Sequence, residues 1–545
     1  MDSTQPGEQP MTSRFTERLL SGLVAAGVAL RLWQYFAGAS LVLGEIALAR
    51  NLTERSVLRL LAEPLSFDQN GAYGYLLILK ATISTLGTGE LAMRFVPALA
   101  GMAALALFVR LARQIIAGPP LLVTVAAFAL GVPFLVYTGQ IKPYGTMEVA
   151  VSLAYSHLAL NWLGGEPDRP AIMRTGIGGL GLLWLAQSAI LAAIGVGVAL
   201  AVATLIRQRP AGLRALAPVL GLWGLGGIAS VLSYFHTMDA GTRATFRSLF
   251  VGGYLPPFPH AKAQVVWLWR VLTEAAGGQF HYWLPGAFVV AVGLGAFWLF
   301  RRNRATLLIL LGPVVAAVLA SAVGFYPFRL HYLFFVFPAF FVLAGVAVDQ
   351  VWRFLGTRAR PADSIWIAGC LAVPVLALVQ NPPVYRLQEM KTVLAHVRDR
   401  RQASDAIYVY FGARQAITYY GPRYGFTPAD FVVGACHRGQ PRGYFREIDQ
   451  FRGRPRVWAL FTHDRGRLRE RAEVLNYLDR IGTVRDSIAI VGPPLPPFSV
   501  GAFGYLYDLS DATRLASATS DNAPLLQEVT PDPRFPCSSG PIAAE

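Results

Sequence analysis

The sequence predicts an α-helical polytopic membrane protein with a small α/β domain at its C-terminal end. Of its 545 residues, 54% are hydrophobic and 15% are charged, the composition of a chain with many membrane spans. Arginines gather in every second gap between the apolar stretches. After about residue 380, short strand-like and helix-like patterns replace the long apolar stretches. The first two observations predict the membrane part, and the third predicts the separate domain.

The arginine pattern predicts which gaps face the cytoplasm, because short arginine-rich loops are costly to move across a membrane. These gaps hold Arg14 and Arg18; Arg110 and Arg113; Arg169 and Arg174; Arg207, Arg209 and Arg214; Arg301, Arg302 and Arg304; and Arg353, Arg358 and Arg360. The short gaps between them contain only Lys142 and Arg329 as basic residues. We therefore expect residues 1–18 in the cytoplasm and the loops 37–90 and 235–281 outside. The arginine gaps explain much of the net charge of +16, so no nucleic-acid partner is expected.

About eleven transmembrane helices, together with interfacial helices, fit this alternation within residues 19–380. The stretch 73–86 is interpreted as an interfacial helix, because a crossing there would move Arg110 and Arg113 outside. The stretch 175–206 is flanked by arginines at both ends, which predicts two short spans that meet at Gln187–Ser188. The other predicted spans are 19–36, 91–108, 121–137, 145–163, 216–234, 282–300, 307–323, 330–348 and 365–379.

The C-terminal region 381–510 has the pattern of an α/β domain, and eleven crossings place it outside the cytoplasm. We predict helices at 387–397 and 467–478, and strands at 406–411, 456–461, 487–491 and 504–509. Residues 511–545 are rich in Ser, Pro and Ala, and are expected to be a disordered tail. Cys436 and Cys537 fall in this outer region, where a disulfide is permitted, and the sequence leaves their pairing open.

Two acidic residues in the first outer loop are candidates for a catalytic base. Glu45 and Asp68 both follow the first predicted span. A carboxylate at the outer interface can take the proton of an acceptor hydroxyl. The alternative is that Glu45 only solvates the surface of a helix.

A second group of candidates lies in the outer turn 137–148, which contains Lys142, Tyr144 and Glu148. Charged groups at this depth are costly unless they are paired or face a polar site. Pro143 and Gly145 loosen the start of the next helix, and a helix N-terminus beside a lysine suits a phosphate. The alternative is that Lys142 extends to the membrane surface without a specific partner.

The third group lies in the outer turn 326–332, where Arg329 can grip a phosphate through two parallel hydrogen bonds. His331 and Tyr332 add polar groups beside it, and Lys80, on the interfacial helix, can join the same cluster. An interfacial arginine among aromatic residues is also a common membrane anchor, and this alternative stays open.

The segments GEIALARNLTERS, PLSFDQNGAYGYLLILK, TGQIKPYG and YPFRLHYLFFVFPAF, in this order, resemble the GT-C glycosyltransferases. The similarity is to the group of protein O-mannosyltransferases and lipid A aminoarabinose transferases, and it covers roughly residues 15–350. It implies an inverting enzyme in a bacterial inner membrane. Such an enzyme moves a sugar from a polyprenyl-phosphate donor to a lipid, glycan or protein acceptor on the extracytoplasmic face.

The resemblance also implies roles for individual residues. Glu45 falls in the first outer loop, where the family carries an acidic pair, and Asp68 is the alternative base in the same loop. Glu148 follows Lys142 and Tyr144, in the turn where the family places an acid after a Lys-x-Tyr pattern. Lys80 and Arg329 match positions expected near the lipid phosphate, and we expect Lys142, Tyr144 and His331 to help bind it. No cofactor follows from these residues, and the involvement of a divalent metal stays open. Membrane lipids are the other expected partners.

Two departures from the family pattern support an alternative. Gly44 stands where the family has the first acid of a pair, and Met147 stands where relatives have an aspartate, so that Glu148 comes one residue late. One residue turns a helical side chain by about 100°, which can aim Glu148 away from the site. These changes favour an inactive scaffold or partner subunit on the same fold. A lipid or sugar transporter is a third reading, but the predicted spans carry few charges at mid-depth.

Overall fold

The computed structural model describes residues 11–165, 168–356, 361–464, 469–492 and 501–514. The chain folds into two compact units, each assembled from segments that are separate in the sequence. The first, here called the helical unit, comprises Met1–Ala37, Asn70–Thr237 and Gly252–Val384. The second, here called the sheet unit, comprises Gly38–Gln69, Met238–Val251 and Tyr385–Glu545.

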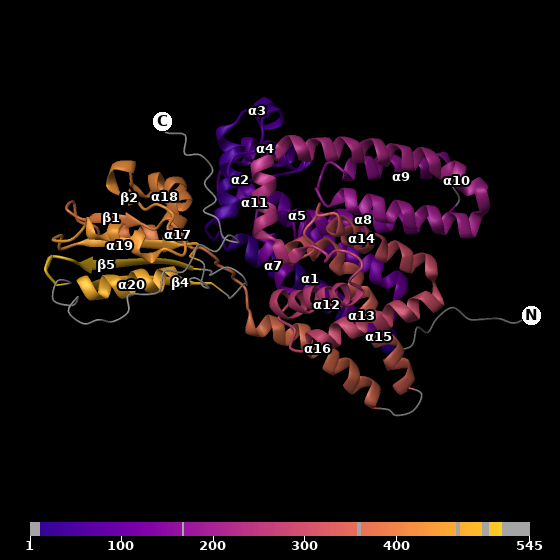
Figure 1. The fold of residues 1–545 in the computed structure, drawn as a ribbon. Helices are drawn as coiled ribbons and strands as arrows, with labels where there is room; N and C mark the ends of the chain where they lie inside the picture. Colours follow the sequence, from indigo (N-terminus) through magenta and orange to yellow (C-terminus); the bar gives the residue numbers. More distant parts are fainter. Residues whose placement is uncertain (1–10, 166–167, 357–360, 465–468, 493–500, 515–545) are drawn as a thin grey trace, which may run out of the picture. The chain divides into compact units, whose positions relative to one another are not determined.

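The helical unit is built from helices, and the longest of them are apolar (Figure 1). They are α1 (Met11–Phe36), α4 (Tyr73–Leu86), α5 (Glu90–Ile115), α6 (Pro119–Ala129), α7 (Val132–Thr138), α8 (Met147–Gly164), α9 (Arg169–Leu182), α10 (Ala189–Thr237), α12 (Ala261–Glu274), the π-helix η2 (Ala275–Gln279), α13 (Pro285–Arg302), α14 (Arg304–Ala322), the 3-10 helix η3 (Leu330–Val336), α15 (Phe337–Gly356) and α16 (Ala362–Gln380).

Seven of the described helices are long and apolar enough to cross a membrane, and the bent pair α6 and α7 makes an eighth. The shorter or less apolar helices α8, α9 and α13 occupy the three remaining predicted spans. Each predicted span is therefore a helix, and the predicted fold class of an integral membrane protein with a small sheet domain is confirmed. Helix α4 has 14 residues, the same length as α9, and its interfacial position stays a prediction.

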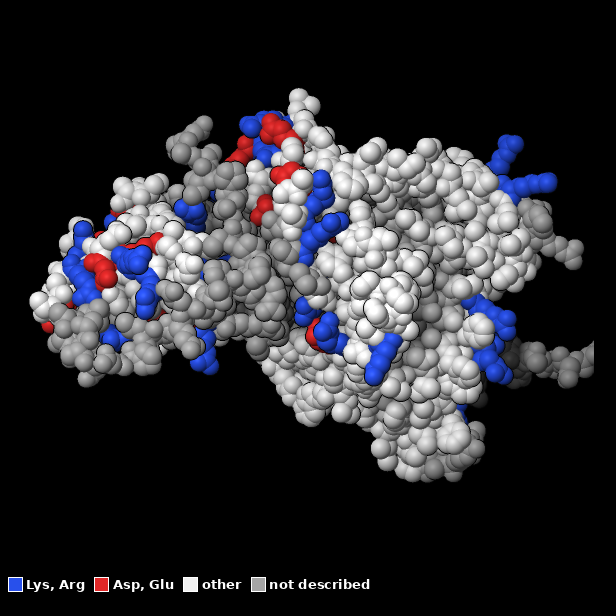
Figure 2. All heavy atoms as spheres, in the orientation of Figure 1, with Lys and Arg blue, Asp and Glu red and all other residues white. Residues whose placement is uncertain are grey.

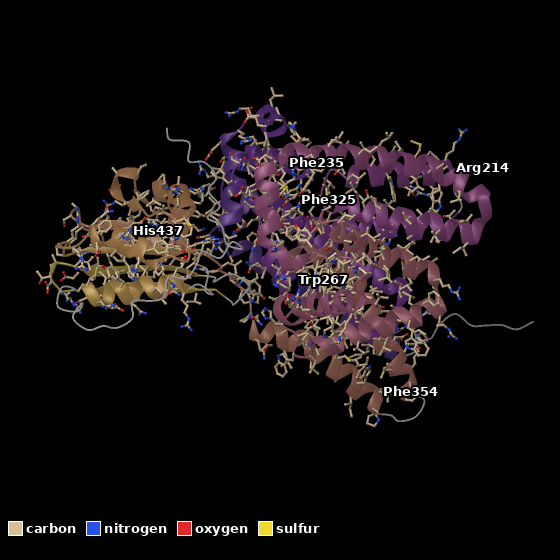
Figure 3. All side chains as sticks on the ribbon, in the orientation of Figure 1. Arg214, Phe235, Trp267, Phe325, Phe354 and His437 are labelled. Atoms are coloured by element: carbon tan, nitrogen blue, oxygen red, sulfur yellow. The ribbon has the colours of Figure 1, made fainter. Side chains whose placement is uncertain are left out.

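Helix α10 contains two of the predicted spans, because it folds back on itself. A Cβ atom added at Gly197 would lie 3.4 Å from Leu220 and 3.6 Å from Trp223, so the two halves of the helix pack together. Figure 3 shows Arg214 at the far end of this hairpin and Phe235 near the opposite end, beside Phe325. The six residues between α9 and α10 form the break that the sequence predicts at Gln187–Ser188.

The pair α6 and α7 is bent by 45°, and a buried arginine satisfies the backbone at the break. Pro133 in the first turn of α7 has no N–H to donate, which favours a break at this point. The guanidinium of Arg31 on α1 donates to the carbonyls of Ala129 at 2.9 Å and Phe128 at 3.4 Å. Carbonyls freed inside a bilayer need such a donor, because no water is available to replace it.

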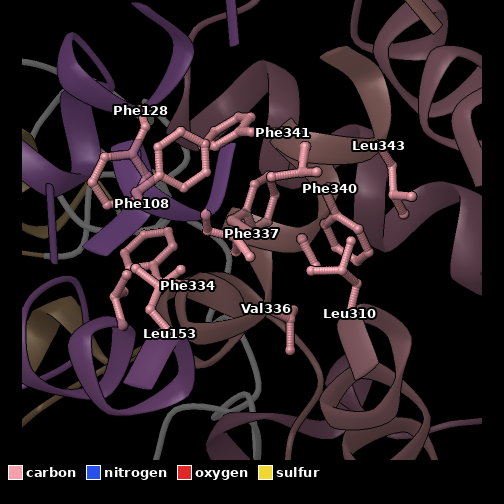
Figure 4. Close-up of a cluster of buried hydrophobic side chains, with 14 of the residues drawn as sticks. Phe108, Phe128, Leu153, Leu310, Phe334, Val336, Phe337, Phe340, Phe341 and Leu343 are labelled. Atoms are coloured by element: carbon pink, nitrogen blue, oxygen red, sulfur yellow. The ribbon is translucent and has the colours of Figure 1, made fainter. Parts of the chain in front are cut away.

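Phenylalanine rings fill the centre of the helical unit (Figure 4). Phe108 stacks on Phe128 at 4.4 Å between ring centroids, and Phe280 stacks on Phe337 at 4.5 Å. Three of the predicted basic gaps meet at one end of the helices: Arg113 pairs with Glu17 at 2.6 Å, and Arg302 donates to the Ile115 carbonyl at 3.4 Å. Figure 2 shows basic side chains at the helix ends and a broad surface without them in between.

The sheet unit contains one five-stranded sheet in the order β2-β1-β3-β5-β4. Strands β1 and β2 pair in parallel, as do β1 and β3, whereas β5 pairs antiparallel with both β3 and β4. The register places Ala406 opposite Val457, and Val457 opposite Tyr507. The strands are β1 (Ala406–Val409), β2 (Val432–Val433), β3 (Val457–Thr462), β4 (Thr483–Val491) and β5 (Gly501–Asp508).

Alternate residues of the sheet face different helices, as the period of two in a strand requires. Tyr408 and Ala459 share an apolar cluster with residues of α19 and α20, whereas Gly504 faces Val393 of α17 on the other side. The helices of this unit are α2 (Leu43–Glu54), α3 (Val57–Ala62), α11 (Ala240–Leu249), α17 (Met390–Arg400), α18 (Arg414–Tyr420), α19 (Pro441–Asp449) and α20 (Glu470–Ile481), with 3-10 turns η4 (Phe411–Ala413), η5 (Gly421–Tyr424) and η6 (Pro428–Asp430). A further 3-10 turn, η1 (Val251–Gly253), precedes α12.

The sequence predicts the four longer strands and helices α17 and α20, and it misses β2, α18 and α19. Cys436 is disulfide-bonded, and its candidate partner Cys537 lies outside the described residues. The predicted tail also lies outside them beyond residue 514.

Candidate functional site

The outer turn between α7 and α8 is held in a compact form by its own backbone. The N–H groups of Thr146 and Glu148 both donate to the Pro143 carbonyl, at 3.2 and 3.0 Å. Gly145 allows the side chain of Tyr137 to pack on the turn, because a Cβ atom there would lie only 2.7 Å from the Tyr137 Cβ. The turn therefore presents Lys142, Tyr144 and Glu148 in a defined arrangement.

Two of the groups singled out in the sequence come together at this turn. The Tyr144 ring lies 4.2 Å from the imidazole of His331 and 5.4 Å from the ring of Tyr332, between centroids. Tyr137 adds a third ring, 5.9 Å from Tyr144. The Tyr326 hydroxyl donates to the Tyr332 backbone carbonyl at 3.0 Å, which closes the loop before η3. The turns 137–148 and 326–332 thus form one aromatic and polar cluster.

Glu148 lies inside this cluster and is only 3% exposed. It is close enough to interact electrostatically with Tyr144, Tyr326 and Tyr332. The one-residue offset from the family pattern therefore does not aim Glu148 out of the cluster.

Three buried side-chain oxygens, on this acid, on Thr146 two residues before it and on Ser188, lack hydrogen-bond partners among the described residues. They are Glu148 Oε2, Thr146 Oγ1 and Ser188 Oγ. Ser188 comes from the break between α9 and α10, and its hydroxyl lies near the Glu148 carboxyl. Buried polar atoms without partners are costly, and they commonly mark a place that water or a ligand completes. This set of oxygens is the strongest indication of a ligand site in the helical unit.

Tyr144 remains a hydrogen-bond donor in this environment. Burial, and then the nearby Glu148 carboxylate, raise the pKa of the Tyr144 hydroxyl above its ordinary value. The hydroxyl therefore keeps its proton at neutral pH.

The two candidate lysines lie on elements that contact each other. Lys142 lies half-buried in the turn and acts electrostatically on His331. Lys80 lies half-buried on α4, whose first turn is tied to this region by Tyr75. The Tyr75 hydroxyl donates to the Ile141 carbonyl at 2.5 Å, and its N–H donates to the Trp184 carbonyl at 3.1 Å. The phosphate-binding roles of both lysines stay predictions.

Arg329 is present at the outer loop before η3, but its guanidinium is already paired. Its Nε and Nη2 atoms donate to Glu274 Oε2 at 3.2 and 3.1 Å. Glu274 ends α12 and is a residue that the sequence reasoning missed. The sequence predicts a phosphate as the partner of the Arg329 guanidinium, whereas the structure pairs it with this carboxylate.

Glu45 and Asp68 belong to the sheet unit. Glu45 is fully buried, and its Oε2 accepts from the Val42 N–H at 3.0 Å at the start of α2, so it does not simply solvate a surface helix. The loop that carries Asp68 is fastened to α2, because Asn51 and Ser66 exchange hydrogen bonds of 3.0 and 2.9 Å. The role of either acid as a base stays a prediction.

The described residues contain no group of three or more His, Cys, Asp or Glu side chains that could hold a metal ion. Sequence reasoning also gave no role to Thr146 or Ser188. Ser188 lay at a predicted break between spans, and such breaks often line polar sites in membrane proteins. The predicted break was therefore the feature of the sequence that could have indicated a role for Ser188.

No family model and no curated protein matches the chain. The chain is similar to the apo structure of ArnT from Cupriavidus metallidurans, at 14% identity and a TM-score of 0.46, over 90% of this chain and 99% of ArnT. ArnT bound to undecaprenyl phosphate matches at 14% identity and a TM-score of 0.44, over 90% of this chain and 98% of ArnT. The Archaeoglobus fulgidus oligosaccharyltransferase in complex with zinc and sulfate matches at 12% identity and a TM-score of 0.45, over 90% of this chain and 73% of that protein.

Both of these proteins have the GT-C fold, the fold that the sequence resemblance names. At these identities and TM-scores they assign no activity, donor or metal to this chain.

Proposed function

We propose that this protein is an inverting membrane glycosyltransferase that uses a polyprenyl-phosphate-linked sugar as donor. The acceptor is a hydroxyl-bearing lipid, glycan or protein on the extracytoplasmic face of a bacterial inner membrane, where the sheet unit also lies. The observation that carries the proposal is the buried acid Glu148, which has an unsatisfied oxygen among tyrosine, serine and threonine groups. Such a site suits a ligand with several hydroxyl groups, which both donate and accept hydrogen bonds.

The chemistry needs one base and one set of cations. The acceptor oxygen attacks the sugar C1 atom as the bond from C1 to the phosphate oxygen breaks, and the configuration at C1 inverts. A carboxylate takes the acceptor proton, with Glu148, Glu45 or Asp68 as the candidate base. Polyprenyl phosphate leaves as a dianion, and Lys80, Lys142 and Arg329 are the candidate groups that stabilise its charge.

A transporter is the weaker alternative. The buried basic side chain of Arg31 lies within a predicted span, but it is hydrogen-bonded to carbonyls at the α6 and α7 break and so has a structural partner. An inactive scaffold rests on two departures from the family pattern, Gly44 and Met147. The second carries less weight because Glu148 lies within the cluster.

The test is turnover by the full chain in lipid nanodiscs. Polyprenyl-phosphate sugars with a labelled monosaccharide are offered with lipid and glycan acceptors, and both the released polyprenyl phosphate and the labelled product are measured. We expect Glu148→Gln and Arg329→Ala each to lower turnover on the order of 10²-fold. The anomeric configuration of the product should be opposite to that of the donor.

A matched control is Glu63→Gln, which removes an exposed carboxylate that pairs with Arg59 outside the candidate site. It should keep wild-type turnover. Unchanged turnover in both site variants would reject the site. Movement of labelled lipid across proteoliposomes without transfer would favour the transporter instead.

A further inference from the structure

At the C-terminal end of α12, two arginines converge on one carboxylate. Glu274 Oε2 accepts from Arg329, and Glu274 Oε1 lies 3.9 Å from Arg270 Nε. A Cβ atom added at Gly252 would lie 3.1 Å from Arg329 Nη1 and 4.0 Å from Arg270 Nη2. Both guanidinium groups therefore gather over the bare backbone of Gly252, around a single negative charge.

The backbone beneath the two arginines is well anchored. The Gly252 carbonyl accepts from Trp267 Nε1 at 3.1 Å, and the Gly253 carbonyl accepts from the Phe328 N–H at 2.7 Å. A Cβ atom at Gly253 would lie 3.1 Å from the Cβ of Arg329. The position of Arg329 is thus set by packing as well as by its ion pair, so its place does not depend on Glu274 alone.

The ion cluster is open to solvent and borders an apolar surface. The side chains of Arg329 and Glu274 are 32% and 40% exposed. On α12, Val265, Val266 and Trp269 are exposed although they are large and apolar. Trp269 packs on Gly286 at the start of α13, whose exposed residues Val290 and Leu294 continue the same kind of surface along a predicted span. A lipid chain is the chemistry that such a continuous surface fits in a membrane protein.

We propose that Glu274 is an internal competitor for the phosphate of the polyprenyl-phosphate lipid, an inference that rests on the proposed function. Without lipid, Glu274 holds the guanidinium groups of Arg329 and Arg270. The lipid lies along the exposed face of α12, and its phosphate displaces the carboxylate. Two guanidinium groups can bind a phosphate dianion through parallel hydrogen bonds, and this anion carries more charge than a carboxylate.

The experiment measures binding of undecaprenyl phosphate to the full chain in nanodiscs of neutral lipid. Glu274→Gln keeps the size of the side chain and removes its charge, so we expect about 3- to 5-fold tighter binding, the range of a partly exposed ion pair. Arg270→Gln should weaken binding, and the gain from Glu274→Gln should disappear when Arg329→Ala is added. Glu63→Gln is the matched control, with a carboxylate that is 42% exposed and paired with Arg59, and it should leave affinity unchanged.

Undecaprenol, which lacks the phosphate, should bind equally to the wild type and to Glu274→Gln. If Glu274→Gln does not fold, Glu274→Asp withdraws the carboxylate by one carbon and should tighten binding in the same direction. Weaker or unchanged affinity of the folded variant for undecaprenyl phosphate would overturn the inference. A variant that binds phosphatidylglycerol more tightly, but not undecaprenyl phosphate, would also overturn it. These measurements read binding alone, so a chain that shows this pattern but transfers no sugar would reject the proposed function and keep the inference.

Discussion

The ring of Tyr144 lies 4.2 Å from the imidazole of His331, between centroids, and this contact joins two outer turns that are far apart in the chain. The contact is tilted by 36° between ring planes and is flanked by Tyr332. It places the turn that carries Lys142 and Glu148 beside the loop that carries Arg329. The convergence of these turns within the helical unit is the structural basis of the candidate site.

The Tyr144 hydroxyl is expected to act as a donor to the bound sugar phosphate. Tyr144→Phe keeps the ring against His331 and removes only the hydroxyl. We therefore expect turnover to fall about 10- to 100-fold, with little change in the thermal unfolding midpoint. Tyr137→Phe is the matched control on the same cluster. Full activity of Tyr144→Phe in the nanodisc assay would remove the hydroxyl from the mechanism.

Arg31 is expected to stabilise the broken span. Arg31→Met leaves the Phe128 and Ala129 carbonyls without their donor, at about 1–3 kcal/mol for each buried group left unsatisfied. The unfolding midpoint in detergent should fall by several degrees. The unfolding midpoint of Arg31→Lys should fall between those of the wild type and Arg31→Met, because one ammonium group reaches fewer carbonyls than a guanidinium. Arg113→Met, which removes an exposed ion pair with Glu17, is the control, and equal midpoints for the two methionine variants would contradict the assignment.

Close packing of α10 on α14 is expected to depend on two glycines. A Cβ atom at Gly195 would lie 2.1 Å from the Gly312 carbonyl oxygen, so Gly195→Ala must push two backbones apart. A loss of about 1–3 kcal/mol is expected for such overpacking. Gly221→Ala lies on the same helix with nothing within 4 Å of its added Cβ, and it should be neutral or slightly stabilising. Thermal unfolding compares Gly195→Ala and Gly221→Ala directly, and equal unfolding midpoints would contradict this account of the helix contact.

In the sheet unit, Asp405 is expected to fasten the first and third strands. Its carboxylate accepts from Arg456 Nε at 2.6 Å and from Trp458 Nε1 at 3.0 Å, and it is buried. Asp405→Asn leaves Arg456 without its ion partner, at about 1–3 kcal/mol, since this arginine is partly exposed. Amide hydrogen exchange in β1 and β3 should become faster. Asp399→Asn removes an exposed pair with Arg398 and should not change exchange, and slow exchange in both variants would refute the role of Asp405.

Local patterns were sufficient for much of the fold. Hydropathy and arginine placement predicted a helix at each span, a helix at α4 and the break at Gln187–Ser188. These signals are readable because each helix must satisfy its own backbone in lipid, whatever its neighbours are. The strand order β2-β1-β3-β5-β4 was not readable, because pairing joins segments that are distant in the chain.

The candidate site was predicted in part. The sequence singled out Lys142, Tyr144 and Glu148 because charged and polar groups are unusual at the ends of apolar spans. It did not indicate that Ser188 approaches Glu148 or that Glu274 pairs with Arg329. Partner choice of this kind depends on which helices pack together, and several acids were equally available to Arg329 along the chain.

Taken alone, the order of apolar and basic residues determined that this chain is a polytopic helical membrane protein with a small α/β domain. It determined this because the bilayer acts on each segment separately, through the cost of burying charge and of leaving backbone groups unpaired. Only the tertiary structure decided that the two outer turns meet at Tyr144 and His331, and that Arg329 holds a carboxylate. Those outcomes follow from packing between distant helices, which no local pattern encodes.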